Sequence, residues 1–462
     1  MKKKKRKNHV DNRMDYNTFK MKNSFFIVAL LLGISSFSQE KKWSLQECVN
    51  YALENNITIK QGENTLLTDE QNIVAAKGNF LPSVSASAGH NIGVGTQRID
   101  IGNTQVIVDR TSNSTSFGVG ANQTIFNGFR LTNLYQQSKL NLETSKLELS
   151  KIKDDISLNV VNAYLNILFN KENLETAKAQ YTFSEKQLEQ VENLVEAGAQ
   201  PRANIYDAEA TLSADAQKVT LAENNVTLAL LTLSQLLQVP FDGFNVQIIT
   251  IDSPSEAILY SNVAPVLNFA LQNRSEIKIA EKNIENAQLN TEISKSGYYP
   301  SVSLGLGFNT NAFYSNLVKN EEAFLDQLNN QKSQSLNLNI NIPIFSRFQN
   351  KTAVAKSKIQ EDNSKLNLEQ AKLNLESNIQ RAFTDAQAAF KAYEASKKSL
   401  TSQELAFNNS KERYNIGSMT SFELEQARIR LINAQASLIN AKYDFVFKTK
   451  VLDFYMGKSL TN

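Results

Sequence analysis

Strict alternation of aliphatic and amide side chains marks one short segment in the second half of the chain. In "SLNLNINIPIF" (335–345) aliphatic residues occupy one parity and asparagines occupy the other as far as Asn341. Because strand side chains alternate between two faces, the pattern predicts a strand with one wholly aliphatic face. That face is predicted to carry Leu336, Leu338, Ile340, Ile342 and Ile344.

Three further segments alternate in the same way, with Ser, Gly or Asn on the second face. Strands are expected at 301–308, at 116–122 and, with a weaker pattern, from Val84 to about Val94. Each half of the chain therefore carries one predicted pair of strands. Aromatic residues stand near the strand ends, at Phe80, Phe126, Tyr298, Tyr299 and Phe345.

Long helices are predicted after each strand pair. Residues 131–197 and 346–416 contain neither Gly nor Pro. In the second stretch apolar residues recur at spacings of 4 and 3, which is the pattern of a coiled-coil seam, at Leu375, Ile379, Ala382, Ala386, Ala389 and Tyr393. A glycine follows each stretch, and returning helices are expected at about 201–238 and 420–456. Each half is thus predicted to contain a long helical hairpin whose tip turns at glycine.

The two halves repeat one plan. "YALENNITIK" (51–60) returns as "FALQNRSEIK" (269–278), and "FLPSVSAS" (80–87) returns as "YYPSVSLG" (298–305). Such self-similarity indicates a duplicated structural unit. We expect a first repeat at 39–240, a linker at 241–265 and a second repeat at 266–462, each repeat built from a helix, a strand pair and a long helical hairpin.

The first 38 residues are predicted to be an N-terminal extension and a signal peptide. From Met21 a positive start precedes an apolar stretch at 25–32 and small residues at Ser36 and Ser38, which is typical of an export signal. Residues 1–38 carry a net charge of +7 and the whole chain +3, so the exported form carries −4. This charge gives no reason to expect nucleic-acid binding.

Composition disfavours an enzyme. The chain has two histidines and one cysteine, no Gly-x-Ser-x-Gly motif and no phosphate-binding glycine loop. Neither a metal site nor a cofactor is expected. An exported structural coiled-coil adhesin would also explain the long helices, and it stands as the alternative from a different class of protein.

The strands have the pattern of membrane β-barrels, in which apolar and polar side chains alternate. Each strand pair leads directly into a long helix with no other core nearby, so the aliphatic face is predicted to contact lipid. Four strands are too few to close a barrel, and open edges are not tolerated in lipid. Several copies must therefore share one barrel: two copies would give eight strands, three would give twelve and four sixteen.

The chain resembles the outer membrane efflux proteins, the TolC-like channels of Gram-negative export systems. The resemblance spans nearly all of residues 43–457 and rests on "WSLQECVNYALENN", on "LPSVS" and "YPSVS", on "QTIFNGFR" and "IPIFSRFQ", and on the two glycine tips. It implies a mainly α fold with a membrane β-barrel part. Four strands per protomer would contribute to a shared 12-stranded barrel in the Gram-negative outer membrane, and the hairpins would form a helical tunnel in the periplasm.

The resemblance also implies partners. A homotrimer would serve as the exit duct of an efflux system, joined through a periplasmic adaptor (membrane fusion) protein to an inner membrane transporter, with outer membrane lipid around the barrel. Type I protein secretion uses the same architecture and stays open as an alternative. The periplasmic end is expected to close by inward coiling of the hairpins.

Candidate gate and docking residues are assigned by matching positions in this chain to the family's motifs around the two tip glycines. The gate residues assigned in this way are Tyr414, Asn204, Asp207, Glu423 and Gln426. The family's basic tether is replaced here by Met419, so the family's salt-bridge lock is not expected. Two of the four inward acidic positions hold Asn204 and Gln426, so a thinner acidic ring is expected. Gly198 and Gly417 are expected to be the tips that dock the adaptor.

Overall fold

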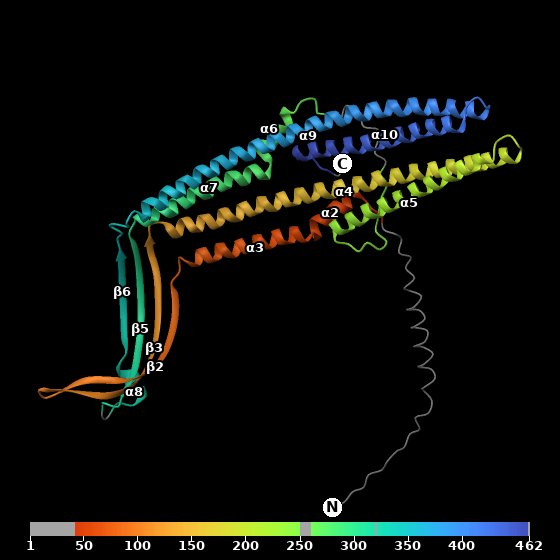
Figure 1. Ribbon diagram of the computed structural model, residues 1–462. Coiled ribbons are helices and arrows are strands. Elements are labelled where there is room, and N and C mark those ends of the chain that lie inside the picture. Colours follow the sequence, from red (N-terminus) through yellow and green to blue (C-terminus); the bar gives the residue numbers. More distant parts are fainter. Residues whose placement is uncertain (1–41, 250–259, 319–320, 461–462) are drawn as a thin grey trace, which may run out of the picture.

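A computed structural model describes residues 42–249, 260–318 and 321–460 (Figure 1). The extension and signal peptide expected at 1–38 lie outside the described residues, and so does part of the expected linker. Helices make up most of the described chain, and the long strands stand together at one end of them (Figure 1). No helix among the described residues is both long and apolar enough to cross a membrane.

Four antiparallel strands form one sheet, in the order β2-β3-β5-β6. They are β2 (Ser83–Ile101), β3 (Thr104–Asn127), β5 (Ser301–Ser315) and β6 (Ser333–Asn341). The register places Ile340 opposite Val302, Leu338 opposite Leu304 and Leu336 opposite Leu306. The aliphatic residues predicted to share a face therefore do so across strands, and Leu336, Leu338 and Ile340 are each more than half exposed in the single chain.

The strand predicted at 335–345 ends earlier than its pattern suggested. β6 stops at Asn341, which pairs with Ser301, the first residue of β5. Ile342 and Ile344 are exposed but have no strand opposite them. In addition, Pro343 lacks the N–H group that a strand ladder needs. The prediction that these two isoleucines lie in the strand is wrong, because a strand extends only as far as its partner.

The first strand is longer than its pattern predicted. β2 and β3 remain paired as far as Ile101 and Thr104, whereas β5 ends at Ser315, opposite Ser112. Residues 93–112 therefore form a two-stranded extension of the sheet, called the β-ribbon below. It projects from the end of the sheet that is farthest from the helices (Figure 1).

The helices follow the same order in both halves. In the first half these are α2 (Leu45–Asn55), α3 (Ile57–Gly78), α4 (Arg130–Glu196) and α5 (Ala203–Leu237). In the second half they are α6 (Ala264–Asn273), α7 (Ser275–Lys295), α8 (Phe324–Asn330), α9 (Gln349–Asn415) and α10 (Ser421–Tyr455). α4 and α9 have 67 residues each, α5 and α10 have 35 each, and all six predicted seam residues of α9 are buried. The repeat boundaries at 39–240 and 266–462 stay predictions.

The turn from strand to helix is the same in both halves. Phe129 and Phe348 precede α4 and α9 with φ of 65° and 63°, in the left-handed region that bulky residues rarely adopt. Each ring packs edge-on against an earlier phenylalanine, Phe126 at 5.3 Å and Phe345 at 5.9 Å between centroids. The duplicated motif thus sets one turn geometry twice.

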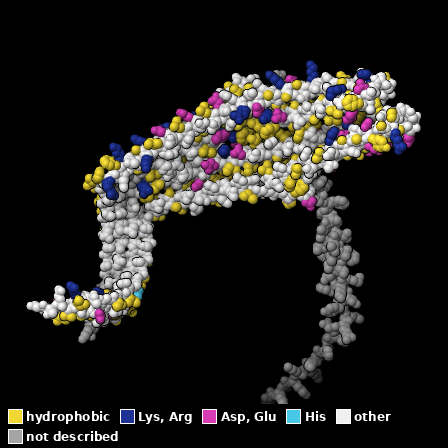
Figure 2. Space-filling model, in the orientation of Figure 1, with side chains coloured by type: hydrophobic (Ala, Val, Ile, Leu, Met, Phe, Trp, Pro, Cys, Tyr) yellow, Lys and Arg dark blue, Asp and Glu magenta, His cyan; other side chains and the backbone are white. Residues whose placement is uncertain are grey.

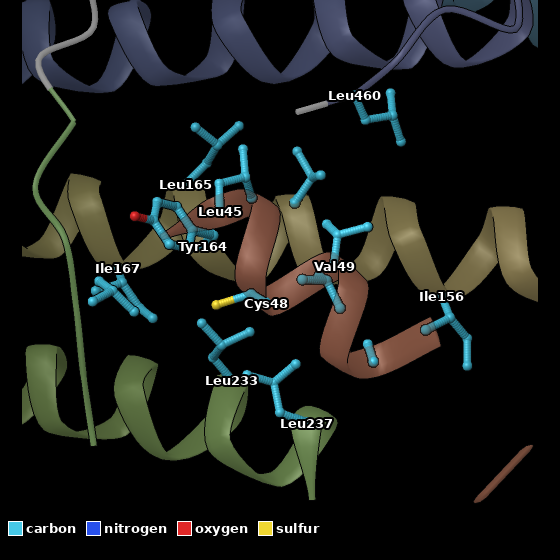
Figure 3. Close-up of a cluster of buried hydrophobic side chains, with 14 of the residues drawn as sticks. Leu45, Cys48, Val49, Ile156, Tyr164, Leu165, Ile167, Leu233, Leu237 and Leu460 are labelled. Carbon is cyan, nitrogen blue, oxygen red and sulfur yellow. The ribbon is translucent and has the colours of Figure 1, made fainter. Parts of the chain in front are cut away.

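The main core lies where α2 packs against α4 and α5 (Figure 3). Cys48, Tyr164, Leu233 and Leu237 are fully buried there. A short parallel pair, β1 (Lys42–Trp43) with β4 (Asn245–Val246), closes one side, and the Tyr164 hydroxyl donates to the Gln247 carbonyl at 2.7 Å. This core fixes the middle of the helices and leaves the hairpin tips to be positioned by contacts of their own.

Candidate functional site

Both hairpin tips turn at the predicted glycines. Gly198 and Gly417 have φ of +70° and +75°, a conformation that glycine adopts without steric cost. At the first tip the N–H groups of Gly198 and Ala199 donate to the carbonyls of Val195 and Leu194, at 3.0 and 2.8 Å. Gly417 and Ser418 repeat these bonds, with Tyr414 and Arg413 as acceptors. Both long helices therefore end in the same glycine-terminated motif.

An aromatic cluster joins the two hairpins near these tips. Phe407, Tyr414, Leu424 and Ala427 are buried together, and Phe183 of α4 packs against them. The rings of Phe183 and Phe407 lie 5.6 Å apart in an edge-on arrangement. Met419, which stands at the position of the family's basic tether, also packs on this cluster. An apolar contact thus occupies the position at which other members of the family were expected to carry a charged tether.

Tyr414 is tied to the first hairpin by a polar chain. Its hydroxyl accepts a hydrogen bond from Gln200 Nε2 at 3.3 Å, and Gln200 Oε1 accepts one from Asn204 Nδ2 at 3.1 Å. Two of the predicted gate residues, Tyr414 and Asn204, are therefore linked through a residue that the sequence did not single out. Their role in a gate stays a prediction.

A buried ionic cluster lies farther from the tips. Arg428 of α10 and Asp215 of α5 are 5% and 1% exposed, and Arg428 Nη1 lies 2.7 Å from Asp215 Oδ2. Ser184 of α4 donates to the same carboxylate oxygen and accepts from Arg428 Nη1 at 3.3 Å. Glu425 receives two 2.8 Å bonds from Arg428, and Lys218 lies 2.9 Å from Asp215 Oδ1. We call these five residues the ionic cluster.

The ionic cluster keeps its charges at neutral pH. Burial raises the pKa of Asp215, but hydrogen bonds from Ser184, Arg428 and Lys218 outweigh it and hold this pKa below its ordinary value of 3.8. Removing one partner from such a pair leaves an uncompensated buried charge, which costs about 3–5 kcal/mol. The cluster therefore joins three helices from both hairpins in one arrangement.

Sequence reasoning missed the ionic cluster, although a local signal was present. Arg428 follows buried Leu424 and Ala427 at helical spacing, so a charged residue occupies a position that faces the core. Asp215 is likewise a buried position of α5. Their pairing joins residues 213 positions apart, which no local pattern indicates.

A cavity of about 270 Å³ separates the hairpins between the tips and the ionic cluster. Asn204 and Asp207 line it together with Tyr414 and Phe422. Glu423 and Gln426 are exposed, and neither is hydrogen-bonded to the first hairpin in the described chain. The single chain therefore gathers three of the five predicted gate residues. Among the described residues, no group of three or more His, Cys, Asp or Glu side chains is placed to hold a metal ion.

Glu423 has a structural role that position in the family did not indicate. It closes a capping box at the start of α10, where its carboxylate accepts from Thr420 N at 2.8 Å and from Thr420 Oγ1 at 2.9 Å. These bonds, from the backbone first and the hydroxyl second, hold the pKa of Glu423 below its ordinary value of 4.5. Glu423 is therefore an exposed, ionised group with a fixed direction.

Comparison with known proteins decides the family. The model of the family described as "Outer membrane efflux protein" matches residues 48–238 and 266–458. The chain belongs to the outer membrane efflux protein family. It is 21% identical to the outer membrane protein TolC of Vibrio cholerae over 385 residues, covering 83% of this chain and 84% of that protein. It is 19% identical to the outer membrane efflux protein BepC of Brucella suis over 443 residues, covering 95% and 91%.

Solved structures of outer membrane channels have the same fold. VceC of Vibrio cholerae superposes with a TM-score of 0.72 at 16% identity, covering 90% of this chain and 96% of that one. CmeC of Campylobacter jejuni gives 0.72 at 20% identity, covering 92% and 91%. The predicted fold class, helical hairpins of a tunnel with strands that contribute to a barrel, is confirmed. The efflux protein thus lies in the Gram-negative outer membrane with its helices in the periplasm, and members of its family are channels rather than enzymes.

The capping role of Glu423 gives a sharper test of its predicted place in the gate. Glu423→Gln removes the charge but keeps an oxygen that can accept from Thr420, whereas Glu423→Ala removes both. If the carboxylate lines a constriction, both variants should reduce the cation preference of reconstituted channels in planar bilayers. In the unmodified channel this preference should persist as the pH falls to about 4.5, because the pKa is lowered. If only Glu423→Ala alters selectivity, Glu423 acts through the helix cap alone.

Proposed function

We propose that three copies of this chain form the outer membrane exit duct of a tripartite efflux system. The observation that supports this best is the open sheet: β2 and β6 are both unpaired at its edges, and its aliphatic face is exposed. Open edges are not tolerated in lipid, so copies of the chain must pair these edges with one another. Three copies of four strands give a barrel of twelve.

The helical hairpins extend the duct towards the inner membrane. A helix of 67 residues spans about 100 Å at about 1.5 Å per residue. An inner membrane transporter would supply the transport energy, and a periplasmic adaptor protein would join it to the hairpin tips. Outer membrane lipid would surround the aliphatic face of the sheet.

Three measurements test the duct. Detergent-purified protein should have the mass of a trimer by light scattering, and the trimer should conduct ions in planar bilayers. A strain that lacks the gene should become sensitive to exported toxic compounds, and the intact gene should restore resistance. A coiled-coil adhesin would extract without detergent, would give no conductance and would leave sensitivity unchanged. Restoration of the secretion of one protein, without any change in compound sensitivity, would favour type I secretion instead.

Replacing a tip glycine with tryptophan tests adaptor docking. Among the described residues no atom lies within 4 Å of a Cβ built at Gly198 or Gly417, so a side chain meets no clash at its first atom, and the expected cost to folding is the backbone strain of a non-glycine residue at positive φ. The side chain would stand on the predicted contact surface, and we expect Gly417→Trp to abolish efflux while trimers stay in the membrane. Compound sensitivity of cells reads out efflux, and non-denaturing gels read out assembly.

The control for this test is Gly417→Ala. Alanine imposes the same backbone strain at φ of +75° without the bulk, so it should retain most of the efflux. Equal loss in both variants would assign the defect to backbone strain. Normal efflux in Gly198→Trp and in Gly417→Trp would exclude the tips as the docking surface.

A further inference from the structure

The β-ribbon inverts the polarity of the sheet from which it extends. In β2 the face opposite the aliphatic one carries only small polar residues and glycine along the sheet, namely Ser83, Ser85, Ser87, Gly89 and Asn91. Farther along, the same face carries aliphatic residues, because Ile99 pairs with Val106, Gln97 pairs with Val108, and Ile101 has the same parity. The other face, aliphatic along most of the sheet, now carries Arg98, Asp100 and Asp109, with Ile107 opposite Arg98.

The root of the β-ribbon is hydrogen-bonded to the end of β5, and beyond it the β-ribbon turns away from the direction of the sheet strands (Figure 1). β5 ends at Ser315, and the next residue, Asn316, continues its hydrogen bonds to β3. Asn316 N donates to Thr111 O at 3.1 Å, its Oδ1 accepts from Thr111 N at 2.8 Å, and its Nδ2 donates to Asp109 O at 3.0 Å. On the same edge the Arg110 guanidinium lies over the Phe313 ring, 5.4 Å from its centroid. The faces of the β-ribbon are therefore the continuation of the faces of the sheet.

The aliphatic face of the β-ribbon is exposed in the single chain. Ile101 is 61% exposed and Val106 is 37% exposed. Figure 2 shows a sheet surface almost free of hydrophobic and charged side chains, and both kinds reappear below it, where the β-ribbon and α8 lie in Figure 1. Exposed apolar surface of this kind, bordered by charge, marks an interaction site.

We propose that the β-ribbons of three copies pack against one another over the outer mouth of the barrel, with their aliphatic faces towards the axis. This inference rests on the trimer proposed above. With the aliphatic face of the sheet in lipid, the small polar face lines the lumen. The β-ribbon continues that inner face beyond the membrane, on the side opposite the periplasmic helices (Figure 1). Beyond the membrane, the inward face of each β-ribbon would therefore face the β-ribbons of the other two copies.

The placement of charges also favours packing between copies of this chain. Arg98, Asp100 and Asp109 lie on the outward face, where water solvates them. The inward face carries one charge at the root, Arg110 over the Phe313 ring, and is uncharged from Gln97 to the turn. Packing three such faces removes apolar surface from water at about 25 cal/mol per Å² without burying a charge. The channel would then have a constriction at its outer mouth, separate from the gate predicted at the hairpin tips.

Matched single cysteines test this packing. Ile101 and Ile107 are 61% and 60% exposed but lie on opposite faces of the β-ribbon, since Ile107 pairs with Arg98. Each is replaced by cysteine in the full chain, and intact cells are treated with a short bifunctional maleimide. The unmodified protein, whose single Cys48 is fully buried, is the blank. We expect at least tenfold more cross-linking between copies for Ile101→Cys than for Ile107→Cys.

The outcomes separate this inference from the proposed trimer. Purified variants are also weighed by light scattering. Trimers that cross-link at Ile101→Cys alone support the inference. Trimers that cross-link equally at both positions, or at neither, overturn it and leave the duct standing; cross-linking at neither means that the β-ribbons lie apart over the lipid surface. Protein that forms no trimer overturns both proposals.

Discussion

Arg428→Ala should open the contact between the two hairpins and raise the resting conductance of the reconstituted channel. The substitution removes the buried cationic partner of Asp215, which is 1% exposed, and leaves the half-exposed Lys218 as its remaining cation. Breaking a buried pair of this kind costs about 3–5 kcal/mol. In the described hairpins a second ionic contact, Lys442 of α10 with Glu172 of α4 at 3.1 Å, lies farther from the tips, so the loss falls on the contact nearer to them. Planar-bilayer recordings of purified trimers measure the change.

Two variants control this prediction. Arg430, two residues along the same helix, is exposed, and Arg430→Ala should leave the conductance unchanged. Replacing both members of the pair, as in Arg428→Met with Asp215→Leu, removes the unpaired charge and should recover most of the stability lost in Arg428→Ala. A normal conductance in Arg428→Ala would show that the ionic cluster does not hold the hairpins together.

Acid provides an independent check on the ionic cluster. Because the pKa of folded Asp215 is lowered, its contribution to stability is complete above 3.8 and is lost as the pH falls through the lowered pKa. Conductance should therefore be stable through mild acid and should rise only below about pH 3.8. Asp215→Asn, which cannot titrate, should abolish that rise. A rise that begins near neutral pH would point to a different titrating group.

Ile340→Lys should prevent most of the protein from reaching the outer membrane. Ile340 pairs with Val302, one residue from the end of β6 that faces the long helices, and a lysine on the lipid side of a barrel costs about 2–4 kcal/mol at the midplane and less towards the interface. Each trimer would carry three such charges. Immunoblots of outer membrane fractions measure the loss.

The neighbouring residue provides the matched control for this strand. Asn339 pairs with Ser303 and lies on the opposite face of β6, so Asn339→Lys should point into the lumen and be tolerated. The two variants add the same charge at adjacent positions, and only the face differs. Equal abundance of both in the outer membrane would contradict a lipid-facing β6.

Patterns formed by residues close together in the sequence were sufficient to predict most of the helices and strands. The absence of Gly and Pro between 346 and 416 predicted α9, and its six seam residues are buried as the spacing indicated. Gly198 and Gly417 marked both turns, because a left-handed φ at the end of a helix strongly favours glycine. The parity of Leu336, Leu338 and Ile340 gave their common face, because strand side chains alternate.

Features that depend on distant partners were decided only by the tertiary structure. β6 ends at Asn341 because β5 begins at Ser301, although the aliphatic alternation runs on to Ile344. The β-ribbon was missed because its apolar residues change face beyond the end of β5, which a single alternating pattern does not follow. Arg428 and Asp215 neutralise each other across 213 residues, and the free energy of a buried charge depends on which partner the fold brings to it.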